Sequence, residues 1–141
     1  GRIETLIGRS RKNRQLMSVA EITGKKSITN YKTLKVFNIK DVPKISFVEC
    51  MLETGRTHQI RVHMAYKGNS LLGDQQYGKK NLKFKKINEE FADKLKVLNR
   101  QALHAKSLGF IHPTSNKLIN FESKLPKDFK KILDLLNKLS H

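Results

Sequence analysis

The stretch LETGRTHQIRVH, Leu52–His63, decides the fold because the hydrophobic pattern changes within it. The residues that lead into it, Ile45–Leu52, are apolar on both faces, which is typical of a central β-strand. Beyond this point Ile60 and Met64 lie four positions apart, a spacing that places two side chains on one face of an α-helix. The sequence therefore predicts a buried strand that is followed closely by a helix.

The ends of this helix are marked by residue types that commonly begin and end helices. Thr57 is a plausible N-cap, because its hydroxyl can accept a hydrogen bond from a free backbone N–H group. Gly68 is a natural helix stop. We therefore expect a helix over Thr57–Lys67, of about three turns. Residues Gly68–Gly78 are expected to form a loop.

The other segments alternate between short strands and helices. Residues 1–14 read as a basic, turn-rich segment, whereas β-branched and aromatic residues favour strands at 17–23 and 27–37. Further along we predict, in order, a short helix, the two strands of a hairpin and an amphipathic helix that begins near Pro126: Glu89–Leu98, Leu103–Ile111, Lys117–Phe121 and 126–139. This pattern predicts an α+β fold with a mixed, mostly antiparallel sheet and flanking helices.

The charge balance points to a polyanionic partner. Lys and Arg total 29 against 12 Asp and Glu, so the formal net charge is +17. Such an excess attracts polyanions and speeds encounter with them. The basic residues are spread over many segments, including Arg9–Arg14 and Lys79–Lys86, rather than gathered on one amphipathic helix. We therefore expect nucleic acid, and not a membrane surface, as the partner.

The cysteine and histidine residues do not suggest a catalytic or metal-binding role, but they indicate the redox environment of the protein. Cys50 is the single cysteine, so no internal disulfide can form, and a reducing, cytoplasmic location is the simple interpretation. We expect Cys50 to be an inert thiol in the apolar run that contains it. His58 and His63 are five positions apart and would lie on different helix faces, so no metal site is predicted.

Four blocks of sequence, in this order and spacing, resemble the RluA-type RNA pseudouridine synthases. They read LETGRTHQIRVH at Leu52–His63, MAYKGNSLLGDQQYG at Met64–Gly78, RQALHAKSLGFIHP at Arg100–Pro113 and FESKLPKDF at Phe121–Phe129. The first block is the most specific, and together the blocks extend the resemblance over nearly the whole chain. The similarity is to RluC- and RluD-like members, which act on large-subunit ribosomal RNA.

The resemblance implies an isomerase that detaches uracil from its ribose and reattaches it through carbon, without a metal or cofactor. The family's essential aspartate belongs to an HRLD-type motif that precedes the blocks found here, and no aspartate of this chain follows an Arg-Leu pair. Asp74 and Asp128 match family positions that we interpret as structural. We therefore interpret residues 1–141 as a single partial domain, the C-terminal portion of a pseudouridine synthase catalytic domain, whose N-terminal part with the catalytic aspartate is missing. Such a fragment is expected to be inactive alone.

Arg61 is the site residue that the resemblance implies most directly, as the arginine that pairs with the catalytic aspartate. A carboxylate in a pocket that excludes water costs free energy unless it is paired, and arginine supplies a permanent, forked positive partner. Within residues 1–141 we expect Arg61 to have lost that partner. From the local pattern alone, the alternative is an exposed arginine on the helix surface.

Four neighbours of Arg61 are candidates for contact with substrate or RNA. Ile60 is expected to line the uracil pocket, with ordinary core packing as the alternative. Arg56, His58 and Gln59 stand at the start of the helix, where free backbone N–H groups bind anions readily. We interpret these three as residues that contact the RNA backbone or support the site, with capping and packing as the alternative.

Three other ring side chains are interpreted as structural. Tyr77 is expected to pack its loop rather than to stack on a base. His104 and His112 lie in or beside a predicted strand, where hydrogen bonding in the core or in a turn is more common than proton transfer.

Two other functions remain open on the sequence. A non-catalytic basic RNA-binding module, such as the remnant of a split gene, would bind RNA in a salt-sensitive way without turnover. A basic DNA-binding domain is less favoured, because no basic helix has the polar, exposed face of a recognition helix. The expected partners are therefore ribosomal RNA and the missing N-terminal half of the same domain, and neither DNA nor a membrane.

Overall fold

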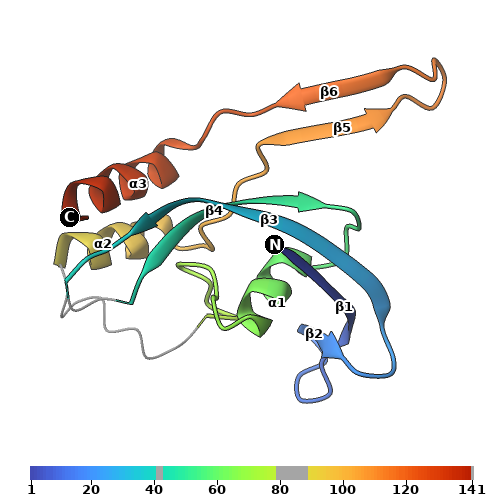
Figure 1. Ribbon diagram of the computed structural model, residues 1–141, viewed down its shortest axis with the longest axis horizontal. Helices are drawn as coiled ribbons and strands as arrows, with labels where there is room; N and C mark the ends of the chain where they lie inside the picture. The colour runs from blue at the N-terminus through green and yellow to red at the C-terminus, as the bar shows by residue number, and fades with distance from the viewer. Residues whose placement is uncertain (41–42, 79–88, 141) are drawn as a thin grey trace.

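The computed structural model describes residues 1–40, 43–78 and 89–140 and has an α+β fold (Figure 1). Its elements are, in chain order, β1 (Arg2–Arg9), β2 (Met17–Ala20), β3 (Lys25–Phe37), β4 (Ile45–Leu52), α1 (Gln59–Tyr66), α2 (Glu89–Leu98), β5 (Ser107–Ile111), β6 (Leu118–Glu122) and α3 (Lys127–Leu139). The predicted fold class is confirmed. The basic run at 79–86 lies outside the described residues.

The strands form two separate sheets. A four-stranded sheet has the order β2-β1-β3-β4, and β5 pairs with β6 in a two-stranded sheet. Every strand pairing in the described part of the chain is antiparallel. The predicted mixture of parallel and antiparallel pairs is therefore not seen there. The long strand β3 is an inner strand of the larger sheet and pairs with β1 and β4.

Strand β1 corrects the prediction of a turn-rich segment over residues 1–14. It runs between β2 and β3, and Ile3 and Ile7 are buried, with 4% and 2% of their surface exposed. The two isoleucines share one face of the strand with Thr5, because strand side chains alternate between faces. This alternation was obscured in the sequence by the charged side chains of Arg2 and Glu4 on the other face.

Strand β4 has the predicted bounds but not the predicted position. It forms the edge of the four-stranded sheet in the described residues, and its side chains are half-buried or exposed. Met51 and Leu52 are 58% and 48% exposed. Cys50 is half-buried on the same strand, where burial and the neighbouring Glu49 charge raise the pKa of its thiol. A raised thiol pKa is the property expected of an unreactive cysteine.

The start of α1 differs from the prediction. The N-cap is His58 rather than Thr57, and no side chain caps the helix. His58 has a φ of 56°, in the left-handed region, and its carbonyl accepts the first helical hydrogen bond from Val62 N at 2.9 Å. Histidine is one of the few residues other than glycine that is enriched in this conformation.

The end of α1 agrees with the prediction at Gly68. Gly68 has a φ of 79°. Its N–H donates to the carbonyl of Ala65 at 2.9 Å, and the N–H of Asn69 donates to the carbonyl of Met64 at 2.9 Å. These two bonds form a Schellman motif, in which a left-handed residue satisfies the last free carbonyls of a helix.

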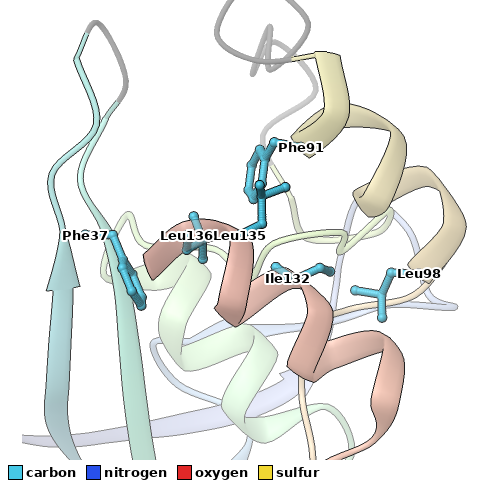
Figure 2. Close-up of a cluster of buried hydrophobic side chains, with 6 residues drawn as sticks. All are labelled: Phe37, Phe91, Leu98, Ile132, Leu135 and Leu136. Atoms are coloured by element: carbon cyan, nitrogen blue, oxygen red, sulfur yellow. The ribbon is translucent and has the colours of Figure 1, made fainter. Parts of the chain in front are cut away.

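The apolar core lies where α2 and α3 pack together beside the end of β3 (Figure 2). Its buried side chains are Phe37, Phe91, Leu98, Ile132, Leu135 and Leu136. Helix α2 has the predicted bounds. Helix α3 begins after Pro126, as predicted, and its buried residues are Phe129, Ile132, Leu135 and Leu136. This cluster supplies the non-directional part of the stability, since each such side chain contributes roughly 1.5–3 kcal/mol on burial.

A second interior region, between α1 and the four-stranded sheet, contains a polar network among buried apolar side chains. His63 is fully buried on α1, and its two ring nitrogens lie 2.9 Å from Thr5 Oγ1 and 2.8 Å from Thr29 Oγ1. No buried side-chain nitrogen or oxygen in the described residues lacks a partner. Buried polar groups need such partners, and a satisfied network fixes the position of the element that carries it. The network therefore fixes α1 on the sheet.

The hairpin β5–β6 projects beyond the rest of the fold (Figure 1). Leu108 lies opposite Phe121, and Phe110 lies opposite Ile119, so one face of the hairpin is apolar. The rings of Phe110 and Phe121 stack with their centroids 6.1 Å apart. All residues of β5 are exposed, so this face is uncovered in the described part of the chain.

Candidate functional site

Arg61 is buried on α1 and does not lie in solvent. It is 8% exposed, between Ile60 and Val62 on the helix that the polar network fixes to the sheet. Its Nε donates to Asp74 Oδ2 at 2.8 Å, and its Nη2 donates to Asp74 Oδ1 at 2.9 Å. Asp74, in the loop after α1, is therefore the charge partner of Arg61 within the described residues, and the sequence analysis did not predict this pairing.

The loop Leu72–Gly78 is built to present the Asp74 carboxylate. Oδ1 also accepts hydrogen bonds from the backbone N–H groups of Gln76 and Tyr77, both at 3.0 Å. Gly73 has a φ of 72°, and an added Cβ there would lie 2.3 Å from the carbonyl oxygen of Arg100. These contacts give a physical reason for the G-D-x-x-Y-G pattern: glycine before the acid permits the turn, and the acid then ties the turn together.

The guanidinium of Arg61 is also held by Gln76 and Tyr77. Its Nη2 donates to Gln76 Oε1 at 2.8 Å, and its Cζ lies 4.8 Å from the centroid of the Tyr77 ring. Arginine stacks well on aromatic faces because its cation is planar and weakly hydrated. No partner of Nη1 is found in the described residues. One edge of the guanidinium is thus fixed, and one amino group remains available.

Tyr77 is itself fixed at its hydroxyl. The backbone N–H of Met17, on β2, donates to Tyr77 Oη at 2.9 Å. His58 Nδ1 lies 2.9 Å from the same oxygen, and the two rings meet edge to face with centroids 5.6 Å apart. Because Oη accepts from Met17, its own proton is available for His58 Nδ1. Tyr77 therefore has the packing role that the sequence predicted.

The electrostatics of this group follow from burial and charge. Burial raises the pKa of the Asp74 carboxyl, but the hydrogen bonds from Arg61 and the two backbone N–H groups outweigh it, so the net pKa is lowered. The hydrogen bond to Asp74 likewise raises the pKa of Arg61. Burial and the Arg61 charge lower the pKa of His58, which favours a neutral ring. Arg61 and Asp74 are thus a fully ionised pair.

The other predicted site residues take different positions around Arg61. Gln59 is 3% exposed, and its amide makes four hydrogen bonds inside the protein, to Thr54, Arg56, Ile28 and Thr29. All four hydrogen bonds tie the start of α1 to β3 and to the turn before the helix.

Arg56 and Ile60 are half-buried. Arg56 Nε donates to the carbonyl of Lys26 at 3.2 Å, at the end of the sheet. Ile60 is not among the residues that line the hollow of about 400 Å³ between β2 and α1, whose lining is Met17, Ser18, Val19, Glu21, Val62, Ala65, Tyr66 and Tyr77.

The two histidines interpreted as structural make local hydrogen bonds. His104 Nε2 lies 3.1 Å from the Ser123 carbonyl, and His112 Nδ1 accepts from two turn N–H groups.

The end of β1 and the loop that follows it carry basic side chains. Arg9, Arg11, Lys12 and Arg14 are all exposed. The charge of Arg9, the last residue of β1, contributes to the lowered pKa of His58. Exposed arginine and lysine near a buried, ordered cation are suited to contacts with phosphate groups.

Within residues 1–40, 43–78 and 89–140, no cluster of three or more His, Cys, Asp or Glu side chains is arranged to hold a metal ion. None of the helices in this part of the chain has the length and apolar character needed to cross a bilayer.

Comparisons with known proteins agree with the sequence motifs. The family model described as RNA pseudouridylate synthase matches residues 1–66. The chain is 42% identical over 137 residues to the ribosomal large subunit pseudouridine synthase D of Zymomonas mobilis, a match that covers 96% of this chain and 40% of that protein. It is also 42% identical over 139 residues to the uncharacterized RNA pseudouridine synthase YlyB of Bacillus subtilis, covering 98% of this chain and 39% of that protein.

A solved structure supports the fold. Human RNA pseudouridylate synthase domain containing 1 aligns with a TM-score of 0.65 and 22% identity, over 97% of this chain and 59% of that chain. The α+β fold and the sequence matches define the class as pseudouridine synthase. The chain belongs to the RluA family of RNA pseudouridine synthases and resembles the synthase D members. It spans about two-fifths of the length of the curated relatives that it matches.

Proposed function

We propose that this chain is the C-terminal part of the catalytic domain of an RNA pseudouridine synthase that acts on large-subunit ribosomal RNA. The observation that carries the proposal is Arg61, which is buried, ionised and held on one edge, with Nη1 unpaired in the described residues. In the family that this chain resembles, the arginine at this position pairs with the catalytic aspartate. That aspartate would come from a part of the protein outside residues 1–141.

The role of Arg61 follows from what an acid needs in such a pocket. A carboxylate that leaves water is destabilised unless a positive partner compensates it. Arg61 would keep the catalytic acid ionised while the bond between uracil and ribose is broken and the bond from carbon is formed. The reaction is an isomerisation, so its protons balance: the carbon that joins the ribose loses a proton, and the ring nitrogen that leaves the ribose takes one up.

RNA binding is proposed for the basic side chains rather than for Arg61. The target uridine must leave its stack, which costs a few kcal/mol, and contacts to the flipped base and the backbone offset this. The exposed loop with Arg9, Arg11, Lys12 and Arg14 is suited to backbone contacts. Arg56 and His58, which are half-buried at the start of α1, are the remaining candidates for contact with the substrate strand.

The experiment is a comparison of residues 1–141 with the complete protein. Tritium release from RNA labelled at the uracil carbon reports turnover, and filter binding at two salt concentrations reports RNA affinity. We expect the complete protein to release tritium and residues 1–141 alone to bind RNA without release. Turnover by residues 1–141 alone would contradict the proposal that the acid lies elsewhere in the protein.

The second candidate is a non-catalytic RNA-binding module, which the net charge of +17 favours. It predicts salt-sensitive binding of structured RNA by both proteins. Absence of tritium release from the complete protein, together with tight RNA binding, would favour this candidate over the synthase.

A further inference from the structure

We propose that Asp74 is a positioning residue, which holds Arg61 by its Nε and Nη2 groups so that Nη1 is presented to a second anionic group. This inference rests on the proposed function, because the second anion is the acid of the same reaction. It assigns to the loop after α1 a role in catalysis beyond the folding of the loop itself.

The geometry of the pair is specific to one orientation of the guanidinium. Nε meets one carboxylate oxygen and Nη2 meets the other, at 2.8 Å and 2.9 Å. Two parallel bonds of this kind fix the plane of the group as well as its position, which a single contact does not do. Gln76 adds a third bond at 2.8 Å on the same Nη2 group. Among the described residues Nη1 has no hydrogen-bond partner, so an approaching anion would meet the guanidinium at a defined place.

The face of the guanidinium is fixed by a second set of contacts. The Tyr77 ring lies 4.8 Å from Arg61 Cζ, and the Tyr77 hydroxyl is held at 2.9 Å by both Met17 N and His58 Nδ1. These contacts come from β2 and from the turn before α1. Strand β2 and the turn before α1 thus support Arg61 through Tyr77, which is more support than a surface arginine needs for stability alone.

Asp74 is unsuited to be the acid itself. Its side chain has no exposed surface, with a value of 0%. Oδ1 accepts three hydrogen bonds and Oδ2 accepts the fourth, so its lone pairs are engaged by Arg61 and by the N–H groups of Gln76 and Tyr77. A carboxylate in this state neither attacks a substrate nor releases its arginine without breaking the loop. The role that remains is to orient Arg61.

The test is Asp74→Asn in the complete protein. The asparagine oxygen can still accept from the backbone N–H groups of Gln76 and Tyr77, which preserves the loop. Its NH₂ group then faces the Nε–H of Arg61, donor against donor, and the charge is lost. We expect kcat to fall by about 10- to 100-fold, as for a small misplacement of a catalytic group. KM for RNA should stay within about twofold, because phosphate contacts lie elsewhere.

The matched control is Asp128→Asn, which makes the same substitution in another arginine–aspartate pair. Arg100 Nη2 lies 2.9 Å from Asp128 Oδ2, and Asp128 is on α3. We expect this variant to keep the kcat of the parent. Thermal melting of both variants, at the assay temperature and above, separates a loss of folded protein from a loss of turnover.

A spectroscopic measurement distinguishes positioning from a general structural role. The Nε–H resonance of Arg61, assigned by its disappearance in Arg61→Lys, should exchange slowly with water in the parent and fast in Asp74→Asn. A kcat of Asp74→Asn within twofold of the parent, in a protein that Arg61→Ala inactivates, would overturn the inference and leave the proposed function standing. A parent protein without turnover would overturn the proposed function itself.

Discussion

Two arginine–aspartate pairs in this chain use the same residue types with different results. Arg61 and Asp74 form a forked pair whose side chains are 9% and 0% exposed. Arg100 and Asp128 form a pair whose side chains are 38% and 39% exposed, with one nitrogen, Nη2, meeting both oxygens. The loop that carries Asp74 touches the backbone of Arg100 through Gly73, so the pairs are neighbours in the fold.

The difference in burial decides how much the loss of one charged partner destabilises the protein. Water solvates the Arg100–Asp128 pair, so the loss of one partner leaves the other hydrated, and exposed pairs contribute little. Water cannot hydrate the Arg61–Asp74 pair in this way, so the loss of one partner would leave an unpaired charge in the interior. The buried pair is also the one at the proposed site.

The largest effect on stability is expected for Arg61→Ala. It would leave the Asp74 carboxylate buried without its main partner and lower the free energy of unfolding by about 3–5 kcal/mol. Urea denaturation followed by circular dichroism measures this change. The matched variant is Arg100→Ala, for which we expect a clearly smaller loss. Equal losses for the two variants would remove the distinction between the pairs.

The next largest loss of stability is expected for a substitution of Gly73, which lets the loop with Asp74 approach the backbone of Arg100. Gly73→Ala places a Cβ in a left-handed conformation and 2.3 Å from the Arg100 carbonyl oxygen. We expect a loss of about 1–3 kcal/mol or more in the free energy of unfolding. Gly55→Ala is the control, because nothing lies within 4 Å of its added Cβ. A melting temperature for Gly73→Ala that equals that of Gly55→Ala would contradict the close approach.

A pH effect is expected from Asp74. The folded pKa of this carboxyl is lowered from 3.8. A lowered pKa contributes stability that is present above the unfolded value and is lost as the pH falls through the folded value. The parent protein should therefore lose stability below about pH 3.8 more steeply than Asp74→Asn. Parallel stability curves for the two proteins in acid would show that Asp74 is not ionised as the pair requires.

A second pH effect, at higher pH, is expected from His63 in the polar interior. Burial lowers the pKa of His63 from 6.5 in the folded state. The unfolded chain then binds a proton that the folded chain does not, so stability falls as the pH drops from 6.5 through the folded pKa. Replacement by glutamine should flatten this part of the curve of unfolding free energy against pH. A curve for His63→Gln that keeps the slope of the parent between pH 6.5 and 5 would mean that another group is responsible.

The smallest effect is expected for Asp128→Asn. Its carboxyl accepts from the backbone N–H of Phe129, which lowers its pKa together with the Arg100 bond, but the group is open to solvent. The asparagine can accept the same backbone bond. We expect a melting temperature within about a degree or two of the parent, and little dependence of the difference on salt at high ionic strength.

The sequence predicted those elements whose pattern is local. Helix α2 was placed at Glu89–Leu98 and α3 from Pro126, because their apolar spacing can be read without knowledge of the rest of the fold. Strand β1 was missed because Ile3 and Ile7 alternate with charged residues in a segment whose basic character dominated. The edge position of β4 could not be read, since an apolar strand looks the same at the centre and at the edge.

The site was predicted only in part, because sequence motifs mark individual residues but do not show which of them pair in space. Arg61 and Asp74 were both singled out, one by the GRTHQIR block and the other by the G-D-x-x-Y-G loop. Their pairing was not, because it depends on how the loop returns across α1. The left-handed conformation of His58 and the bridge from His63 to two threonines were missed as well. Each is set by tertiary contacts and leaves no periodic signal.

The most direct test of the central claim is the rate of tritium release by the complete protein with Arg61→Ala, measured beside Arg100→Ala on the same labelled RNA. Loss of one positive group at a reacting centre typically lowers kcat by 10²–10³-fold, and we predict a loss of about this size for Arg61→Ala with RNA binding retained. Arg100→Ala should release tritium at close to the parent rate. Near-normal release by Arg61→Ala would contradict the claim that the buried arginine serves the reaction.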